Sequence, residues 1–233
     1  MSITGETGWQ ARVAEEGFAV VEGAVTAERA ESVLKRLLEC ELRWSRAGAR
    51  HVLQQKCVAE IAESEEMMRL AEGVLGDGAV AFRATLFGKS AESNWLVGWH
   101  QDTALPLREK TEREGWGPWS VKDGLHYAHA PVEALERVVA LRLALDDSTE
   151  ANGPLRVLPG TQGMGVMTDE AILELAKRIE SVSCPVGLGG VVAMRPLAVH
   201  ASSKSASDAP RRVLHIEYAE SLEIAEGMTL VRA

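Results

Sequence analysis

The chain has little of what several classes of protein depend on. Its 233 residues include three cysteines, Cys40, Cys57 and Cys184. An odd number at such wide spacing provides neither a disulfide framework nor a zinc knuckle, so we expect a reducing, cytoplasmic location. No apolar run approaches the ~20 residues of a membrane span, and the N-terminus has no basic segment followed by an apolar one. We therefore expect neither a membrane association nor a signal peptide.

Positive charge is also scarce. Asp and Glu outnumber Lys and Arg by 34 to 25, which gives a net charge of −9. No basic run is present either, so the sequence predicts no nucleic-acid partner. Repeats, low-complexity segments and linkers are missing as well. A chain of 233 residues that is 46% hydrophobic is long enough for one sizeable core, and we expect residues 1–233 to form a single domain.

The first third of the chain, about residues 1–78, is predicted to be helical with one short strand at 18–22. Thr26 should cap a helix, because apolar residues follow it at helical spacing. A second helix is expected over 58–75, where Gly76 ends it. The sequence therefore predicts that the N-terminal part is mainly helical.

From residue 79 onward the hydrophobic period changes to two, which is typical of strands. One further helix is predicted at 169–180. Apolar residues occupy both faces of several strands, so the sheet should be covered on its outside, and the early helices are its natural cover. The pattern predicts a mainly β fold with flanking helices, either a sandwich or a closed barrel. The expected strands lie at 79–89, 95–102, 138–146, 155–158, 190–194, 198–202 and 211–219.

His100 and Asp102 form the most informative pattern. Residues i and i+2 of a strand point to the same face, so this pair can present an imidazole and a carboxylate to one metal ion. His200, at the end of a later apolar run, is a third candidate ligand. Two histidines and one carboxylate leave open positions on the metal, a set that suits non-haem Fe(II) oxygenases.

Taking His100 and Asp102 as inward-facing also orients the neighbouring residues. Trp95 and Trp99 should then face outward. The inner faces of the other strands combine small residues with several polar ones. Because unpaired buried charge is costly in a plain core, these residues predict a pocket. The polar residues expected on the inner face are Arg83, Thr85, Arg142, Arg211 and His215.

The segment 115–124 is rich in aromatic and glycine residues and is predicted to be a long loop. Trp116 and Trp119 could cover the pocket as a lid, and packing of the loop itself is an equally good interpretation. His126 comes soon after this segment and is a further candidate for the pocket wall.

With these residues in view, the chain resembles the phytanoyl-CoA dioxygenase (PhyH) family of Fe(II)/2-oxoglutarate-dependent oxygenases. The resemblance covers about residues 17–219. It implies a double-stranded β-helix, a jelly-roll or cupin-like fold. The matching pieces, in chain order, are Trp99-His-Gln-Asp, Asp146-Asp, Asn152-Gly-Pro-Leu-Arg-Val-Leu-Pro-Gly, Arg195-Pro-Leu-Ala-Val-His and Arg211.

The resemblance also implies roles for individual residues. His100, Asp102 and His200 would bind Fe(II), and Arg211 would pair with the far carboxylate of 2-oxoglutarate, because its planar fork suits a carboxylate. Thr85 and Ser202 match positions that help to hold this cosubstrate. The implied reaction uses O2, releases succinate and CO2, and hydroxylates a small organic substrate. Asp102 favours hydroxylation, since related halogenases lack this carboxylate.

Two other functions stay open at this point. One is a cupin-like isomerase or hydrolase that uses Zn or Mn at the same three residues without 2-oxoglutarate. The other is a non-catalytic jelly roll that binds a metal or ligand. Arg211 favours the oxygenase, because neither alternative needs an arginine at this spacing.

The substrate is expected to be a small, anionic molecule. Arg142 and Arg83 would need anionic partners if both face the pocket. Asp146 or Glu217 could pair with one of them. We favour Arg142 as the arginine left for a substrate carboxylate or phosphate, since small neighbours leave room beside it. The candidate substrate-binding residues are Arg142, Arg83, Trp116, Trp119, His126 and His215.

Overall fold

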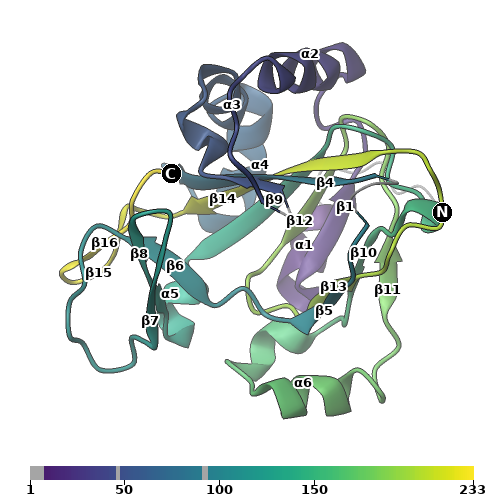
Figure 1. Cartoon of the computed structure of the whole chain (residues 1–233). Coiled ribbons are helices and arrows are strands. Elements are labelled where there is room, and N and C mark those ends of the chain that lie inside the picture. The colour runs from purple at the N-terminus through teal and green to yellow at the C-terminus, as the bar shows by residue number, and fades with distance from the viewer. Residues whose placement is uncertain (1–7, 46–47, 91–93) are drawn as a thin grey trace.

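Two antiparallel β-sheets form the centre of the structure, a computed structural model that describes residues 8–45, 48–90 and 94–233 (Figure 1). The larger sheet has seven strands and the smaller has four. The larger sheet contains, in spatial order, β1 (Phe18–Val21), β12 (Val191–Met194), β9 (Val138–Ala144), β14 (Arg211–Ala219), β4 (Val80–Lys89), β3 (Gly48–Arg50) and β2 (Trp44–Ser45). The smaller contains β11 (Val182–Cys184), β10 (Leu155–Val157), β13 (His200–Ser202) and β5 (Val97–His100).

The two sheets pack face to face over part of their area. There, apolar side chains of both sheets meet in a buried cluster that includes Phe18, Met194 and Leu155. Elsewhere the inner faces carry polar side chains around a cavity. Two facing antiparallel sheets connected in this order form a double-stranded β-helix, or jelly roll, which confirms the fold expected from the sequence.

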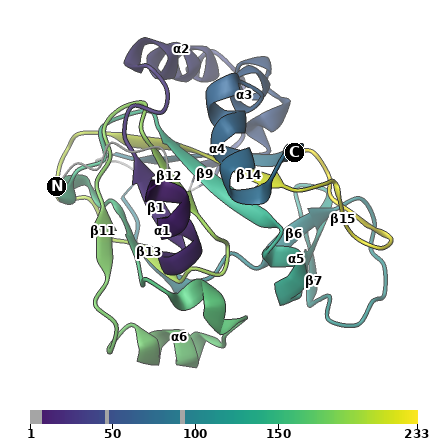
Figure 2. The ribbon, with the colours of Figure 1, turned by 180° about the vertical axis from the view of Figure 1, so that it is seen from behind.

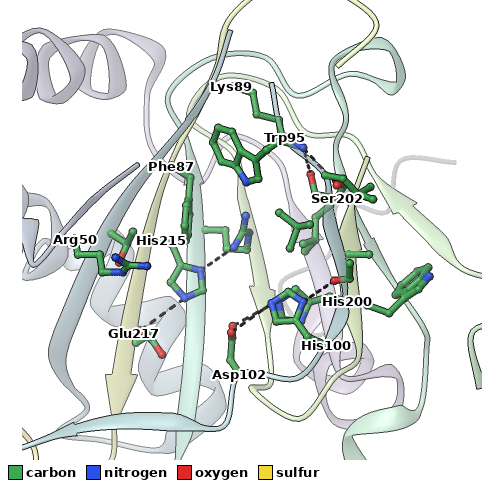
Figure 3. Close-up of a pocket in the computed structure, with 18 of the residues that line it drawn as sticks. Arg50, Phe87, Lys89, Trp95, His100, Asp102, His200, Ser202, His215 and Glu217 are labelled. Carbon is green, nitrogen blue, oxygen red and sulfur yellow. Dashed lines mark hydrogen bonds and ion pairs between the residues drawn. The ribbon is translucent and has the colours of Figure 1, made fainter. Parts of the chain in front are cut away.

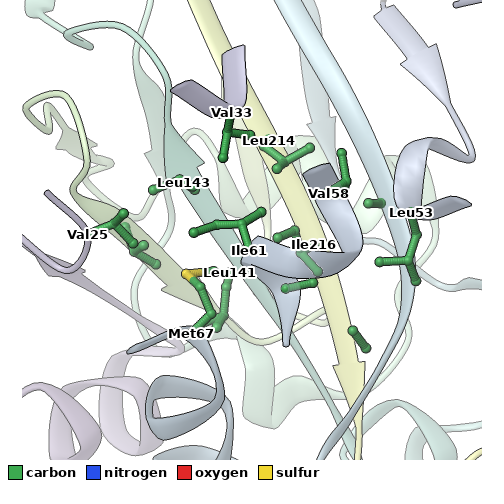
Figure 4. Packing of buried hydrophobic residues seen from close by; sticks show 14 of the residues in the cluster. Val25, Val33, Leu53, Val58, Ile61, Met67, Leu141, Leu143, Leu214 and Ile216 are labelled. Carbon is green, nitrogen blue, oxygen red and sulfur yellow. The ribbon is translucent and has the colours of Figure 1, made fainter. Parts of the chain in front are cut away.

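Helices cover the outer face of the larger sheet, as the apolar residues on both strand faces predict (Figures 1 and 2). Leu141 of β9 and Leu214 and Ile216 of β14 pack against Ile61 and Met67 of the helical layer (Figure 4). The alternation of β14 therefore divides its side chains between this core and the cavity. The layer contains α1 (Gly8–Glu16), α2 (Ala27–Leu38), the 3-10 turn η1 (Val52–Gln54), α3 (Lys56–Ala62) and α4 (Glu65–Leu75).

Thr26 caps α2 as predicted, with its side chain accepting the backbone N–H of Arg29. The single helix expected over 58–75 is wrong, because the chain forms α3 and α4 instead. The hydroxyl of Ser64 accepts the backbone N–H of Met67 and starts a new helix there. The short strands β2 and β3 were not predicted, because two or three residues are too few to show a period.

A small three-stranded sheet and a hairpin lie beside the two main sheets (Figure 1). The expected long loop at 115–124 is wrong in its second half, where residues 119–122 form a strand. Trp116 is buried in an apolar cluster with Leu105 and Leu107. The elements of this region are β6 (Ala104–Leu107), β7 (Trp119–Lys122), β8 (Leu125–His129), α5 (Val132–Leu135), β15 (Glu223–Ala225) and β16 (Met228–Thr229).

Helix α6 (Asp169–Leu175) matches the first part of the helix expected over 169–180. Its Ile172 packs with Leu158, Val199 and Trp99 against the outside of the smaller sheet. In the described part of the chain, no helix is long and apolar enough to cross a membrane. Two further 3-10 turns are η2 (Glu150–Asn152) and η3 (Thr161–Met164).

Candidate metal centre and its cavity

His100, Asp102 and His200 converge at one place on the smaller sheet (Figure 3). β5 and β13 are neighbouring antiparallel strands, and His100 and His200 stand directly opposite each other in their register, with ring centroids 4.2 Å apart. Oδ1 of Asp102 lies 3.7 Å from Nε2 of His100, and Oδ2 lies 3.5 Å from Nε2 of His200. All three donor atoms lie within 4.8 Å of one another, so the set fits one metal ion.

Backbone carbonyls orient both imidazoles. Nδ1 of His100 lies 2.8 Å from the carbonyl oxygen of Gly98, and Nδ1 of His200 lies 2.9 Å from that of Ala198. A carbonyl oxygen only accepts hydrogen bonds, so each Nδ1 carries the proton. Each Nε2 therefore has a free lone pair directed at the centre, as metal ligation requires.

Gln101, between His100 and Asp102, fixes the turn that carries these two candidate ligands. Its amide nitrogen donates to the carbonyl of Leu197 at 2.8 Å, and its amide oxygen accepts the N–H of Met167 at 2.9 Å. The N–H of Asp102 donates to the carbonyl of Pro196 at 2.9 Å. The turn after His100 is thus tied to the segment that leads into His200, a task of Gln101 that the sequence pattern did not reveal.

The protonation states of this group also suit a metal. Burial raises the pKa of Asp102, but the neighbouring His200 and His100 outweigh this and hold the pKa well below its ordinary value. Burial lowers the pKa of His200 to about 4. At neutral pH a carboxylate therefore faces an unprotonated imidazole, the forms that bind divalent cations.

A cavity of about 750 Å³ opens over the three residues. This size is typical of small-molecule sites, which range from roughly 300 to 1,000 Å³. The larger sheet supplies the wall that faces His100 and His200. The cavity is lined by all the predicted metal and cosubstrate residues, and by three of the six predicted substrate residues. Those residues are His100, Asp102, His200, Arg211, Thr85, Ser202, Arg142, Arg83 and His215.

Arg211 and a lysine meet at Ser202 on one side of this cavity. Nη2 of Arg211 donates to the hydroxyl of Ser202 at 3.3 Å, and Nζ of Lys89 donates to the same oxygen at 2.7 Å. Nε of Arg211 is buried and has no hydrogen-bond partner among the described residues. Burial, and then the charge of Arg211, lowers the pKa of Lys89 to about 7. Two adjacent buried cations with an unused donor predict a bound anion here.

Lys89 was missed in the sequence, although its parity is the same as that of Arg83 and Thr85. It is the last residue of β4 and the register partner of Arg211. A lysine at a strand end is usually taken as exposed, yet this one is 2% exposed. Following the parity from Thr85 through Phe87 to the end of the predicted strand 79–89 would have found it.

Arg83 and Arg142 differ in their partners. Arg83 forms an ion pair with Glu217, its cross-strand neighbour, including a bond of 2.6 Å from Nη2 to Oε1. Nη1 of Arg142 donates to Nδ1 of His215 at 2.9 Å. Asp146, the other acid considered for these arginines, pairs with Arg212. The structure thus matches the expectation that Glu217 takes one inward arginine.

Trp116, Trp119 and His126 do not line the cavity. Of the two interpretations of the tryptophans, the structure favours packing over a lid, and His126 is not part of the cavity wall. Trp116 is buried among apolar residues, and Trp119 packs against the same cluster. His126 precedes Tyr127, whose side chain lines the cavity. Because neighbours on a strand alternate, His126 points to the other face of β8.

Trp95 corrects a further expectation. It was expected to face outward, but it lines the cavity (Figure 3). β5 begins only at Val97, so the alternation counted from His100 does not extend back to Trp95. Tyr127 and Phe87 also line the cavity and were not predicted.

Two comparisons of sequence bear on this site. The model of the phytanoyl-CoA dioxygenase (PhyH) family matches residues 13–213. The L-proline trans-4-hydroxylase of Streptomyces griseoviridis is 27% identical over 194 residues, which are 72% of this chain and 64% of the hydroxylase. The match therefore spans less than two thirds of that relative's length.

Solved structures share the fold. AviO1 from Streptomyces viridochromogenes Tue57 matches with a TM-score of 0.69 at 21% identity, over 94% of this chain and 96% of AviO1. EctD from S. alaskensis with 2-oxoglutarate and 5-hydroxyectoine matches with a TM-score of 0.69 at 20% identity, over 94% of this chain and 78% of EctD. At these identities the likeness establishes the jelly-roll fold.

Proposed function

The chain belongs to the phytanoyl-CoA dioxygenase family, and on this premise we propose that it is an Fe(II)- and 2-oxoglutarate-dependent dioxygenase. It hydroxylates a small organic substrate with O2 and releases succinate and CO2. The observation that carries the proposal is the meeting of two histidines, one carboxylate and a buried arginine with an unused donor in one cavity. An isomerase or hydrolase that needs only a metal leaves no task for Arg211.

His100, Asp102 and His200 hold the Fe(II), which supplies the redox chemistry with O2 when it is bound. The donor set fits this ion, because the three residues leave open coordination positions. Arg211 and Lys89 bind the far carboxylate of 2-oxoglutarate, and Ser202 and Thr85 contribute to the same subsite. The buried cavity wall orients the substrate and excludes water.

A small molecule is the partner that this cavity suits. A volume of about 750 Å³ admits a compact substrate, and the related hydroxylase is named for L-proline. We also propose that the protein is cytoplasmic and does not bind nucleic acid. The free thiols of Cys57 and Cys184 and the acidic net charge of −9 support them.

Anaerobic addition of Fe(II) and 2-oxoglutarate tests the proposal. The wild-type protein should develop the visible metal-to-ligand charge-transfer band of a chelated cosubstrate, and His200→Ala should lose it. His126→Ala is the matched control, because that imidazole lies outside the cavity, and it should keep the band. A wild-type protein without the band that retains Zn or Mn after purification would favour the isomerase or hydrolase. Retained metal without consumption of 2-oxoglutarate after O2 is admitted would favour the non-catalytic jelly roll.

A further inference from the structure

Several cations on the inner face of the larger sheet have no acidic partner among the described residues: Arg50, Lys89, Arg142 and Arg211. Arg83 is paired with Glu217. Arg211 lies beside Lys89 in the subsite proposed for the far carboxylate of 2-oxoglutarate. Arg142 of β9 belongs to neither group, and no acidic side chain in residues 8–45, 48–90 and 94–233 forms an ion pair with it.

Neutral groups hold the guanidinium of Arg142. Its Nη1 donates to Nδ1 of His215 at 2.9 Å, and its Cζ lies 5.6 Å from the ring centroid of Phe87. Its neighbours on the same face of β9, Ala140 and Ala144, are small and buried. These contacts fix the orientation of the guanidinium and leave most of its five N–H donors free for a ligand in the cavity.

The charge of Arg142 cannot be removed by losing a proton. Burial lowers its pKa, but an arginine stays protonated in proteins. His215 cannot compensate, because burial, and then the charge of Arg142, lowers its pKa well below the ordinary value and keeps it neutral. An isolated charge inside a protein is costly unless an anion comes to meet it.

The proposed metal and cosubstrate do not supply that anion. The three negative charges of Asp102 and of the two carboxylates of 2-oxoglutarate are already balanced by Fe(II) and Arg211, and Lys89 adds further positive charge. Arg142 then keeps one positive charge beside the reaction centre. A single carboxylate matches this charge and the planar fork of Arg142, whereas a phosphate dianion would also need Arg50, which lines the same cavity.

We propose that Arg142 binds a carboxylate group of the substrate, so that the substrate class is the small monocarboxylic acids. This inference rests on the proposed function and adds the substrate class to it. The planar guanidinium accepts a carboxylate through two parallel hydrogen bonds. The contacts with His215 and Phe87 hold it in the orientation that this binding needs.

Stability is the first test, because it separates a binding role from a structural one. If Arg142 awaits a ligand, Arg142→Met removes an unbalanced buried charge, and the variant should unfold at the same temperature as the wild type or higher. If Arg142 holds the fold together, the variant should unfold at a clearly lower temperature, and that result would overturn the proposal. Arg83→Met is the matched comparison. It leaves Glu217 unpaired and should be the less stable of the two.

Ligand binding is the second test and needs no turnover. L-Proline, pipecolate, benzoate and butyrate are added to the anaerobic protein with Fe(II) and 2-oxoglutarate, each beside its primary amide and beside a phosphate monoester. At least one carboxylate should raise the unfolding temperature of the wild type where its amide does not. Arg142→Met should bind that acid at least about tenfold more weakly. An equal shift by acid and amide, a shift by the phosphate alone, or no shift by any acid would contradict the proposal.

Consumption of 2-oxoglutarate without substrate is the third test. Arg142→Met should keep the charge-transfer band and should not raise the KM for 2-oxoglutarate, since its loss leaves Lys89 and Arg211 in place and removes a repelling charge. A raised KM in this variant would assign Arg142 to the cosubstrate and overturn the inference, while the proposed function would stand. A wild-type protein without the band would instead overturn the proposed function itself.

Discussion

The two faces of strand β14 have opposite chemistry, although they alternate along the same nine residues. Leu214 and Ile216 point to the helices and pack in an apolar core. Arg211, His215 and Glu217 point to the cavity and are all buried as well. The outer face contributes apolar burial, which stabilises the fold. The inner face contains buried polar groups, which are costly to fold unless each finds a partner. In this sheet the side chains that stabilise the fold point outward to the helices, and the side chains proposed for the chemistry point inward to the cavity.

The largest effect should follow removal of a metal ligand on the smaller sheet. His200→Ala should greatly reduce Fe(II) binding and bring turnover to background, because one imidazole and one carboxylate hold the ion much more weakly than the full set of three ligands. Asp102→Gly should also lose turnover while it keeps some iron through the two histidines. Metal analysis of the purified variants and far-UV circular dichroism check both statements. Near-normal turnover in His200→Ala would remove the assignment of the centre.

Leu214→Ala, on the outer face of β14, should have the opposite effect: it should lower stability and leave catalysis unchanged. Leu214 is fully buried, so the truncation leaves a cavity and should lower the free energy of unfolding by about 2–5 kcal/mol. Its neighbour His215 keeps its place on the inner face, so kcat and the KM for 2-oxoglutarate of the folded fraction should not change. Urea denaturation and initial rates at a temperature well below unfolding measure the two quantities. A large loss of kcat in folded protein would show that the faces are coupled.

Which side chains of the larger sheet face the helices and which face the cavity could largely be predicted from the sequence. The alternation over 211–219 orients every side chain of β14, and the same rule places Arg83, Thr85 and Arg142 correctly. The rule holds because a long strand with one apolar face has a single register that buries that face. The same alternation predicts that His100 and Asp102 share a site, but Asp102 lies in the turn after β5, and this turn brings its carboxylate to His100.

The rest could not be predicted, for local reasons. Strands β6, β7 and β8 have four or five residues each, too few to distinguish a strand from an aromatic loop, so the sequence does not decide between a lid and packing for Trp116. Trp95 precedes the strand that orients His100. Whether Glu217 pairs with Arg83 or Arg142 depends on contacts between strands that are far apart in the chain. Parity puts all three on one face and does not choose between them.

Arg211→Ala should have a smaller effect than loss of a ligand. The variant should keep its iron but bind 2-oxoglutarate about ten- to a hundredfold more weakly, since a hydrogen bond to a charged group contributes roughly 1.5–3 kcal/mol. Titration of the charge-transfer band measures the affinity. Arg212→Ala is the matched control on the other face of the strand. It removes the ion pair with Asp146 and should leave the affinity for 2-oxoglutarate unchanged. Equal effects of the two variants would show that Arg211 has no special relation to the cosubstrate.

The smallest expected effect is a pH dependence that Lys89 gives to cosubstrate binding. The charges that bear on Lys89 are those of Arg211 on β14 and Arg142 on β9, and Nζ also lies 5.7 Å from the ring centroid of Trp95. Burial and these two arginines lower its pKa from 10.5 to about 7. An added carboxylate favours the charged form, so binding of 2-oxoglutarate should take up a proton above that pH. Affinity should be highest below about pH 7 and should fall a few-fold as the pH rises through the folded pKa.

The lowered pKa of Lys89 also makes the stability of the fold depend on pH. The folded pKa lies below the unfolded one, so between about pH 7 and 10.5 the unfolded chain binds more protons, and stability contributed by this group rises with pH. The free-energy cost of burying the charged form of Lys89 therefore has its full value below about pH 7 and falls to zero toward pH 10.5. Lys89→Met should gain most over the wild type at pH 6 and less at pH 9, and its affinity for 2-oxoglutarate should lose the pH dependence. Lys177→Met, which changes an exposed lysine of an ion pair with Glu174, should behave like the wild type in both measurements. A pH-independent gap between Lys89→Met and the wild type would show that Lys89 stays charged throughout, as a fixed partner of the distal carboxylate.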